Sequence, residues 1–266
     1  MKIVILPPYQ NKHGLVIKQT QELMDNMEKK GQITRDEYII DEGPLIDWPD
    51  HRRDSEFLAN ISLGIIKKVK EYTKTGGIDA MVCQGSMEPG FFASREVTDI
   101  PYMGSLHASL HVASILGDRC SVIEATDPQA ILVRRHAKMY GFNDKLVGVR
   151  CPGYSSTQMG ILINDYPKGE RTRCPDLQKC VKDIVNQCIA AVEQDGADSV
   201  ILSCTPLQVL EDEVRMGFDE AGYQDVPLIG ELSAAVAMAK AIVSMKLTHA
   251  RLAYPRADTR LKPTVR

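Results

Sequence analysis

Cys204 is the residue whose sequence surroundings most favour chemistry. It follows the apolar run DSVILS, which is typical of a strand, and it precedes Thr205-Pro206 at the expected start of a helix. Backbone N–H groups at such a helix start would lower the pKa of the thiol toward neutrality. A thiol in this state serves as a general acid or base, so we expect Cys204 to be catalytic, the plainer alternative being a buried unreactive cysteine.

A second copy of this pattern lies earlier in the chain. Gly77-Ile-Asp-Ala-Met-Val matches Gly196-Ala-Asp-Ser-Val-Ile, and Ile100-Pro-Tyr-Met-Gly matches Val226-Pro-Leu-Ile-Gly. The sequence therefore predicts an internal duplication around residues 77–106 and 196–232. Two similar halves facing each other would place their strand ends and helix starts around one cleft, where parallel sheets bind ligands.

The elements that position these residues alternate between short apolar runs and amphipathic helical stretches. This alternation predicts an α/β fold of two pseudo-symmetric lobes, each a mostly parallel sheet flanked by helices. We expect residues 1–107 with 226–266 to form lobe one and residues 108–225 to form lobe two. The predicted strands are 2–6, 80–83, 120–123, 145–149 and the run before Cys204, and the predicted helices are 14–30, 55–72, 105–116, 128–140, 175–194 and 207–221. Residues 151–173 read as a long connection, either a flexible active-site loop or a plain surface crossover.

Composition narrows the function classes. The chain has 266 residues, 44% of them hydrophobic, and a net charge of −3, without a basic patch for nucleic acid or an anionic membrane. The first apolar run is too short for a signal or spanning segment, so we expect a cytoplasmic protein, and the seven cysteines fit reduced thiols. Neither a P-loop nor a GxGxxG motif follows the first strand, which argues against nucleotide cofactors. We therefore expect a small-molecule substrate and no cofactor.

Several motifs together resemble the aspartate/glutamate/hydantoin racemase superfamily. They are PGFFASRE, IPYMGSL, LGDRCSVI, GADSVILSCT and VPLIGEL, and their residue patterns are most similar to those of hydantoin racemases. The resemblance implies a cofactor-independent enzyme of two lobes, in which one cysteine from each lobe faces the substrate α-carbon. One thiol removes the proton, and the other returns a proton on the opposite face. By the same analogy we expect a homo-oligomer.

The first lobe departs from this pattern. Counted from the echoed Asp79 and Asp198, the position that matches Cys204 is Gly85, and Cys83 lies two residues earlier on the strand. Successive residues of a strand alternate faces, so Cys83 points the same way but roughly 6 to 7 Å deeper. Either Cys83 reaches the cleft, or another group supplies the second proton relay, or the enzyme works from one face. Glu124, at the end of a predicted strand, is the candidate for that second group.

A one-thiol interpretation also has a precedent in the superfamily. The sequence resembles arylmalonate decarboxylase in having glycine at the first-lobe position and a Pro-Pro pair after the first strand. In such an enzyme hydrogen-bond donors stabilise an enediolate and the single thiol protonates it. The expected substrate-binding residues are those of the loops around the cleft: Pro8, Tyr9, Gln10, Gly85, Ser86, Thr126, Asp127 and Thr205.

The sequence thus favours a racemase or isomerase of a small carbonyl-activated carbon acid, such as a hydantoin-like cyclic ureide or a carboxylic acid. The alternatives are a single-cysteine decarboxylase or lyase and a catalytically silent binding protein. His107 and His111 have the i, i+4 spacing of metal ligands, but no third ligand is near in sequence, so we expect no metal site and assign them to a helix face. Glu88, before Pro89-Gly90, is expected to be a turn or helix-cap residue.

Overall fold

The chain forms two four-stranded parallel sheets of the same design. The computed structural model describes residues 1–10, 14–46 and 54–256. The strand orders are β2-β1-β3-β4 and β6-β5-β7-β8, and all neighbouring strands are parallel. This confirms the predicted α/β fold with two similar halves. The strands are β1 (Ile3–Leu6), β2 (Tyr38–Ile40), β3 (Ala80–Cys83), β4 (Tyr102–Gly104), β5 (Cys120–Ile123), β6 (Leu146–Arg150), β7 (Ser199–Leu202) and β8 (Leu228–Gly230).

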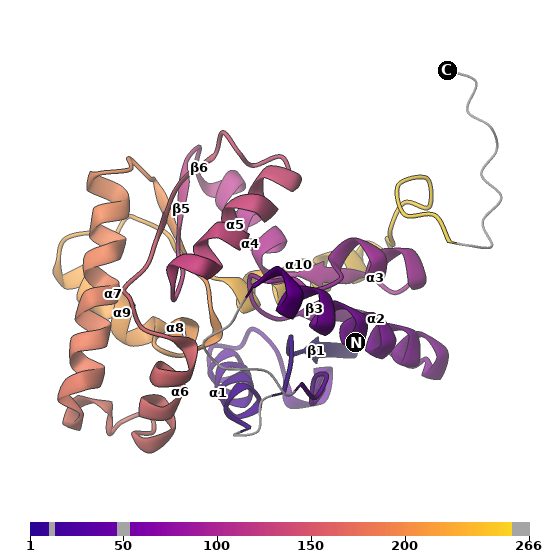
Figure 1. Ribbon diagram of the computed structural model, residues 1–266, viewed down its shortest axis with the longest axis horizontal. Coiled ribbons are helices and arrows are strands. Elements are labelled where there is room, and N and C mark those ends of the chain that lie inside the picture. The colour runs from indigo at the N-terminus through magenta and orange to yellow at the C-terminus, as the bar shows by residue number, and fades with distance from the viewer. Residues whose placement is uncertain (11–13, 47–53, 257–266) are drawn as a thin grey trace.

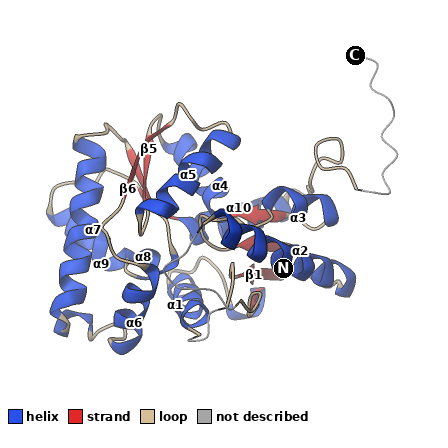
Figure 2. Ribbon diagram, in the orientation of Figure 1, coloured by secondary structure: helices blue, strands red, loops and turns tan. Residues whose placement is uncertain are grey.

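Helices cover both faces of each sheet (Figures 1 and 2). The half that contains β5 and β6 lies on the left of Figure 1, and the half that contains β1 and β3 lies on the right. The helices are α1 (Leu15–Lys29), α2 (Ser55–Thr75), α3 (Phe91–Val97), α4 (Ser105–Leu116), α5 (Asp127–Met139), α6 (Ser156–Asp165), α7 (Pro175–Glu193), α8 (Thr205–Val209), α9 (Glu211–Glu220) and α10 (Glu231–Ser244), with short 3-10 turns at Arg35–Glu37 and Arg171–Arg173.

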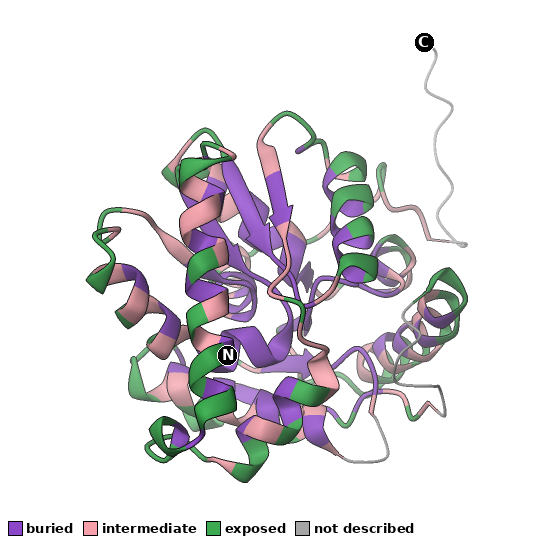
Figure 3. Cartoon of the chain, turned by 60° about the vertical axis from the view of Figure 1, so that its left-hand side comes forward, coloured by how far each residue is buried: buried purple, intermediate pink, exposed green. Residues whose placement is uncertain are grey.

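The strands form because they are short runs of apolar residues that the sheets bury on both faces. Every residue of β1, β3, β5 and β7 is buried, as Figure 3 shows for the strands at the centre of the molecule. Continuous burial is what a parallel sheet covered by helices on both faces requires. One hydrophobic cluster contains residues of both sheets, including Val82 of β3 and Leu202 of β7. The two halves therefore share a core.

Two helices cross between the halves. Helix α4 follows β4 of the first sheet but contacts β5, β7 and β8 of the second, and α10 follows β8 but contacts β3 and β4 of the first. The two helices also pack against each other at the centre of the molecule. Strand β8 pairs with β7, so a boundary drawn by hydrogen bonding falls after Gly230 rather than at residue 226. The proposed lobe division otherwise stands as a proposal, and its end, residues 257–266, lies outside the described residues.

Two predicted elements differ from the structure. The single helix expected at 207–221 is two helices, α8 and α9, because Leu210 leaves helical geometry between them. The expected connection at 151–173 contains helix α6, whose start is fixed by a capping box between Ser155 and Gln158. Within the part of the chain that the structure describes, no helix has the length and apolarity needed to span a bilayer.

Candidate functional site

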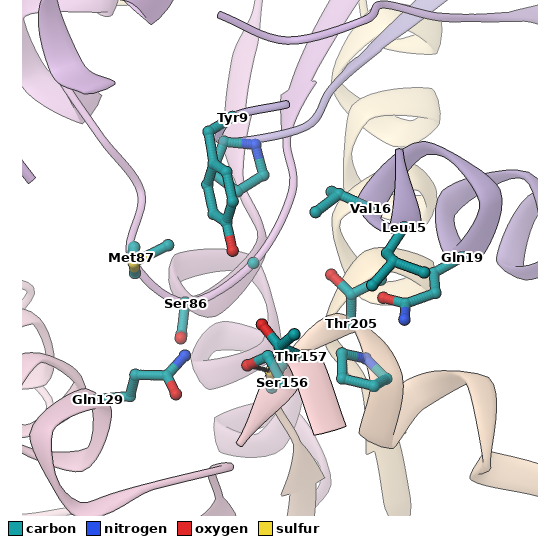
Figure 4. A pocket seen from close by; sticks show the side chains of 14 residues that line it. Tyr9, Leu15, Val16, Gln19, Ser86, Met87, Gln129, Ser156, Thr157 and Thr205 are labelled. Carbon is teal, nitrogen blue, oxygen red and sulfur yellow. Dashed lines mark hydrogen bonds between the residues drawn. The ribbon is translucent and has the colours of Figure 1, made fainter. Parts of the chain in front are cut away.

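One pocket lies where the two halves meet, at the carboxyl ends of β3 and β7 (Figure 4). Loops after the central strands of both sheets form its walls together with residues of α1, α5 and α6, and this is where parallel α/β sheets bind ligands. The structure brings together six of the residues that the sequence singled out. They are Pro8, Tyr9, Gly85, Ser86, Cys204 and Thr205.

Cys204 stands two residues after the end of β7 and before the first turn of α8. Its φ of 43° lies in the left-handed region, which a residue with a side chain adopts only at a cost of about 1–3 kcal/mol. Cys204 lines the pocket, and the residue as a whole is 7% exposed. Its Sγ lies 3.0 Å from the Ser156 hydroxyl oxygen, and the Gln129 side chain also hydrogen-bonds to it.

The protonation state of Cys204 corrects the expectation from the sequence. Burial raises the pKa of the thiol well above its ordinary value, and the neighbouring carboxylate of Glu124 adds to the rise. Hydrogen bonds from Ser156 and Gln129 act in the opposite direction but are smaller. Helix α8 has only five residues, so it offers little of the dipole on which the prediction relied. The resting site therefore holds a protonated thiol, which is a proton donor.

Gly85 is the structural counterpart of Cys204 in the first half. It stands two residues after the end of β3, as Cys204 does after β7, and its φ is 83°. A Cβ atom built on Gly85 meets no atom within 4 Å. The first half thus presents an open glycine where the second half presents a thiol.

The structure does not support Cys83 as a catalytic residue. Cys83 is the last residue of β3, is fully buried, and lies in a hydrophobic cluster with Leu6, Phe91 and Tyr102. Burial raises the pKa of its thiol to about 12, although a hydrogen bond with Tyr102 opposes the rise. The position two residues deeper on the strand leaves it in the core, so it does not line the pocket.

Glu124 connects the two walls of the site. Its Oε2 accepts hydrogen bonds from Ser86 Oγ at 2.6 Å and from Ser203 Oγ at 2.7 Å, and its Oε1 accepts one from the Ala125 N–H at 2.7 Å. Burial raises the pKa of Glu124, whereas these donors and the Cys204 side chain lower it. The carboxylate does not line the pocket itself, but it contacts Ser86 of one wall and Cys204 of the other.

Thr205 is oriented by a hydrogen-bond chain that crosses between the halves. Gln84 Nε2 donates to Thr205 Oγ1 at 2.9 Å, and Thr20 Oγ1 donates to Gln84 Oε1 at 2.8 Å. Because the Thr205 oxygen accepts from Gln84, its own hydroxyl proton is available to a ligand. Thr205 is therefore placed to donate to an oxygen that gains negative charge during a reaction.

Three predicted binding residues lie outside the pocket. Gln10 pairs through its backbone with Pro44 and Leu45. Thr126 Oγ1 donates to Gln129 Oε1 at 3.0 Å, so it positions a lining residue instead of reaching the ligand. Asp127 is exposed at the first turn of α5 and interacts with Cys151.

Glu88 accepts a hydrogen bond from the first turn of α4, whereas α3, the helix that it precedes, has Gly90 as its N-cap residue. Its Oε1 accepts the backbone N–H of His107 at 2.9 Å in the first turn of α4, and its Oε2 accepts the Tyr140 hydroxyl. Burial raises the pKa of Glu88 to about 7. Gly104 makes room for this carboxylate, because a Cβ there would lie 2.1 Å from Oε1.

Four polar lining residues were missed by the sequence reasoning: Gln19, Gln129, Ser156 and Thr157. Ser156 and Thr157 open α6, and the capping box at its start was a readable signal. The two glutamines lie inside α1 and α5, where helical spacing gives no sign that a polar side chain faces a pocket instead of solvent.

His107 and His111 take part in an aromatic cluster. Their rings lie 4.6 Å apart and contact Tyr140 and Phe142 respectively. Burial lowers the pKa of His107 to about 3. Within residues 1–10, 14–46 and 54–256, no three His, Cys, Asp or Glu side chains are grouped as metal ligands.

Comparison with known proteins places these features in a family. The sequence model described as Asp/Glu/Hydantoin racemase matches residues 44–239. A hydantoin racemase from Pseudomonas sp. (strain NS671) is 28% identical over 182 residues, which cover 68% of this chain and 65% of that protein.

Solved structures share the fold. Allantoin racemase from Klebsiella pneumoniae superposes with a TM-score of 0.73 at 19% identity, covering 99% of this chain and 97% of that one. An arylmalonate decarboxylase variant in which a glycine is replaced by cysteine gives a TM-score of 0.53 at 15% identity, with coverages of 99% and 97%. At these identities the likeness describes the fold alone.

Proposed function

Since this chain belongs to the Asp/Glu/hydantoin racemase family, we propose that it is a cofactor-independent racemase or isomerase of a small molecule. Its reaction moves a proton at a carbon atom next to a carbonyl group, as in a hydantoin-like cyclic ureide or a carboxylic acid. The observation that carries the proposal is the Cys204 thiol, which lines the same pocket as Ser86 of the opposite half. An acid and a base on two sides of one carbon are what inversion requires.

The proton transfers follow from the contacts of Glu124. On the first-half side, the substrate C–H bond breaks, its proton passes to Ser86 Oγ, and the Ser86 proton passes to the Glu124 carboxylate. On the second-half side, the Cys204 S–H bond breaks and a new C–H bond forms. The Thr205 hydroxyl donates to the oxygen of the intermediate enolate. Because Glu124 interacts with Cys204 as well, its new proton returns to the thiolate and resets the site.

A second candidate reaction is decarboxylation, which the glycine at position 85 favours. With Gly85 opposite Cys204, the first half supplies no thiol, and the Cys204 thiol is already protonated. In this reaction the C–C bond to a carboxylate breaks, CO₂ leaves, and its electron pair forms an enolate. Cys204 then donates its proton to that carbon, and the thiolate takes up one proton from solvent.

Reaction in D₂O with candidate hydantoins and α-substituted carboxylic acids tests the proposal. Inversion with deuterium entering at the reacting carbon and no CO₂ supports the racemase. Release of CO₂ with one deuterium incorporated stereospecifically supports the decarboxylase. Absence of both exchange and CO₂ with every compound favours a silent binding protein and contradicts the proposal.

Replacement of Cys204 by serine tests its role in either reaction. We expect Cys204→Ser to lower kcat by about 10²–10⁴-fold, the usual contribution of a general acid or base. The matched control is Cys151→Ser, because Cys151 is half-buried and does not line the pocket. Equal activity of the two variants contradicts a catalytic Cys204.

A further inference from the structure

Gln19 is a buried amide that the proton transfers above leave unused. It lies on α1, is 6% exposed, and lines the pocket. Its Nε2 has no hydrogen-bond partner among the described residues. Figure 4 shows its side chain on the opposite side of the pocket from Gln129. A buried amide without a partner destabilises the folded protein, so such a group in a pocket calls for an explanation.

Helix α6 leaves room for this amide at Gly160. A Cβ atom on Gly160 would lie 2.4 Å from Gln19 Nε2, which is closer than any real side chain approaches. Glycine inside a helix is itself unfavourable relative to alanine. Gly160 and the unpartnered Gln19 therefore both lower the stability of the folded protein. They do so at the same contact, between α1 of the first half and α6 of the second. Nε2 itself is buried against Gly160, so a ligand in the pocket pairs with it once the amide turns toward the pocket, and that hydrogen bond offsets the loss.

The chemistry of the described lining points to the kind of ligand. The polar side chains are hydroxyls, amides and one thiol, and each of these is neutral in the resting site. A glutamine amide presents a carbonyl acceptor beside N–H donors. Its complement is a group with an N–H beside a C=O, which is the edge of a cyclic amide or ureide.

We propose that Gln19 is a specificity-determining residue that binds the neutral amide edge of the substrate, away from the carbon that faces Cys204. The inference rests on the proposed function, because it assigns the non-reacting end of the same substrate to the wall formed by α1. It selects cyclic ureides over free carboxylic acids.

Binding measurements test this without turnover. Calorimetry with the Cys204→Ser protein would compare a 5-substituted hydantoin with the ring-opened carboxylic acid of the same substituent. We expect the hydantoin to bind more tightly, and Gln19→Leu to weaken it at least tenfold while leaving the carboxylic acid unchanged. Gly160→Ala, which displaces the Gln19 amide, should also weaken binding of the hydantoin. Tighter binding of the acid, no hydantoin binding, or equal affinities with and without Gln19 overturns the inference.

Kinetics separate this inference from the proposed function. In the protein with Cys204 intact, Gln19→Leu should raise KM and leave kcat within about twofold, since it removes binding that substrate and transition state share. Gln19→Leu should also unfold at the same or a higher temperature, because it removes an unpartnered amide. If Cys204→Ser is inactive but Gln19→Leu leaves KM unchanged, the proposed function stands and the role of Gln19 is wrong.

Discussion

At the scale of single residues, the site is set by the competition between burial and hydrogen bonding. Burial raises the pKa of both Cys204 and Glu124, and their hydrogen-bond donors only partly oppose the rise. The resting Cys204 thiol is therefore protonated, so it donates a proton before its thiolate can accept one. Glu124 is a stronger base than an exposed carboxylate, because its raised pKa increases its affinity for the proton that Ser86 relays.

The raised pKa of Cys204 predicts slow alkylation at neutral pH. Only the thiolate reacts, so the rate of labelling by iodoacetamide should rise about tenfold per pH unit from 7 to 9 without levelling off. Peptide mass spectrometry at each pH measures this rate, and the Cys204→Ser protein identifies the peptide. A substrate analogue should slow the labelling. A plateau below pH 8 would instead show the lowered pKa expected from the sequence.

Glu88 predicts a pH-dependent effect on stability. Its pKa in the folded protein is about 7, above its ordinary value of 4.5, so the folded state binds more protons than the unfolded state between these values. The contribution of Glu88 to stability is therefore full below pH 4.5 and falls as the pH rises to 7, by about 3 kcal/mol. Glu88→Gln stays neutral, so its melting temperature should rise relative to that of the unmodified protein as the pH increases from 5 to 8.

The matched control for Glu88 is Glu96→Gln, because Glu96 is an exposed glutamate on the neighbouring helix α3. Glu88→Gln should raise the melting temperature more than Glu96→Gln does over the same pH range. A difference between Glu88→Gln and the unmodified protein that does not change with pH would mean that Glu88 is not held neutral by burial.

At the scale of elements, the loops after β3 and β7 have the same backbone course but different side chains. Gly85 and Cys204 both have positive φ, two residues beyond the strand. Helix α6 completes the site from one side only, by placing Ser156 beside the thiol. The symmetry of the fold thus supports an asymmetric site.

The open space at Gly85 predicts that a second thiol can be introduced. Gly85→Cys should fold, since a Cβ there meets no atom, but the positive φ should cost about 1–2 kcal/mol of stability. With a thiol on both sides, racemisation should increase relative to decarboxylation. Chiral chromatography and CO₂ release measure the two reactions. Gly85→Ala carries the same backbone cost without the thiol, so equal changes in both variants would contradict the prediction.

At the scale of the whole molecule, the exchange of α4 and α10 joins the two halves into one unit. Each helix belongs in sequence to one sheet and contacts the other, and one hydrophobic cluster contains residues of both. Neither half therefore buries its apolar surface alone. The pocket lies at this junction, so its two walls keep their relative positions only while both halves are folded.

This arrangement predicts a single cooperative unfolding transition. Scanning calorimetry should give one peak with equal calorimetric and van't Hoff enthalpies, because separation of the halves exposes the shared core. Two resolved transitions would show that the halves fold independently. Light scattering on the same sample measures the mass of the protein in solution. The homo-oligomer expected by analogy remains a prediction that this measurement tests.

The sequence by itself determined the α/β fold with two similar halves and the position of Cys204 just after a strand. Runs such as Ala80–Cys83 and Cys120–Ile123 match the observed strands at both ends, because a strand buried on both faces is mostly apolar along its length. The motif repeated in the two halves predicted Gly85 as the counterpart of Cys204, because residues at equal spacing from equivalent strands occupy equivalent positions. These features depend on local periodicity, which a sequence displays directly.

Only the tertiary structure decided the protonation of Cys204, the exclusion of Cys83 and the inclusion of Gln19 and Gln129. A pKa depends on how much solvent and which charges surround a group, and Glu124 approaches Cys204 from another strand. Cys83 and Gln19 are likewise defined by which side of an element faces the other half. Contacts between segments far apart in the chain leave no periodic trace in either segment, so they appear only when the two sheets are brought together.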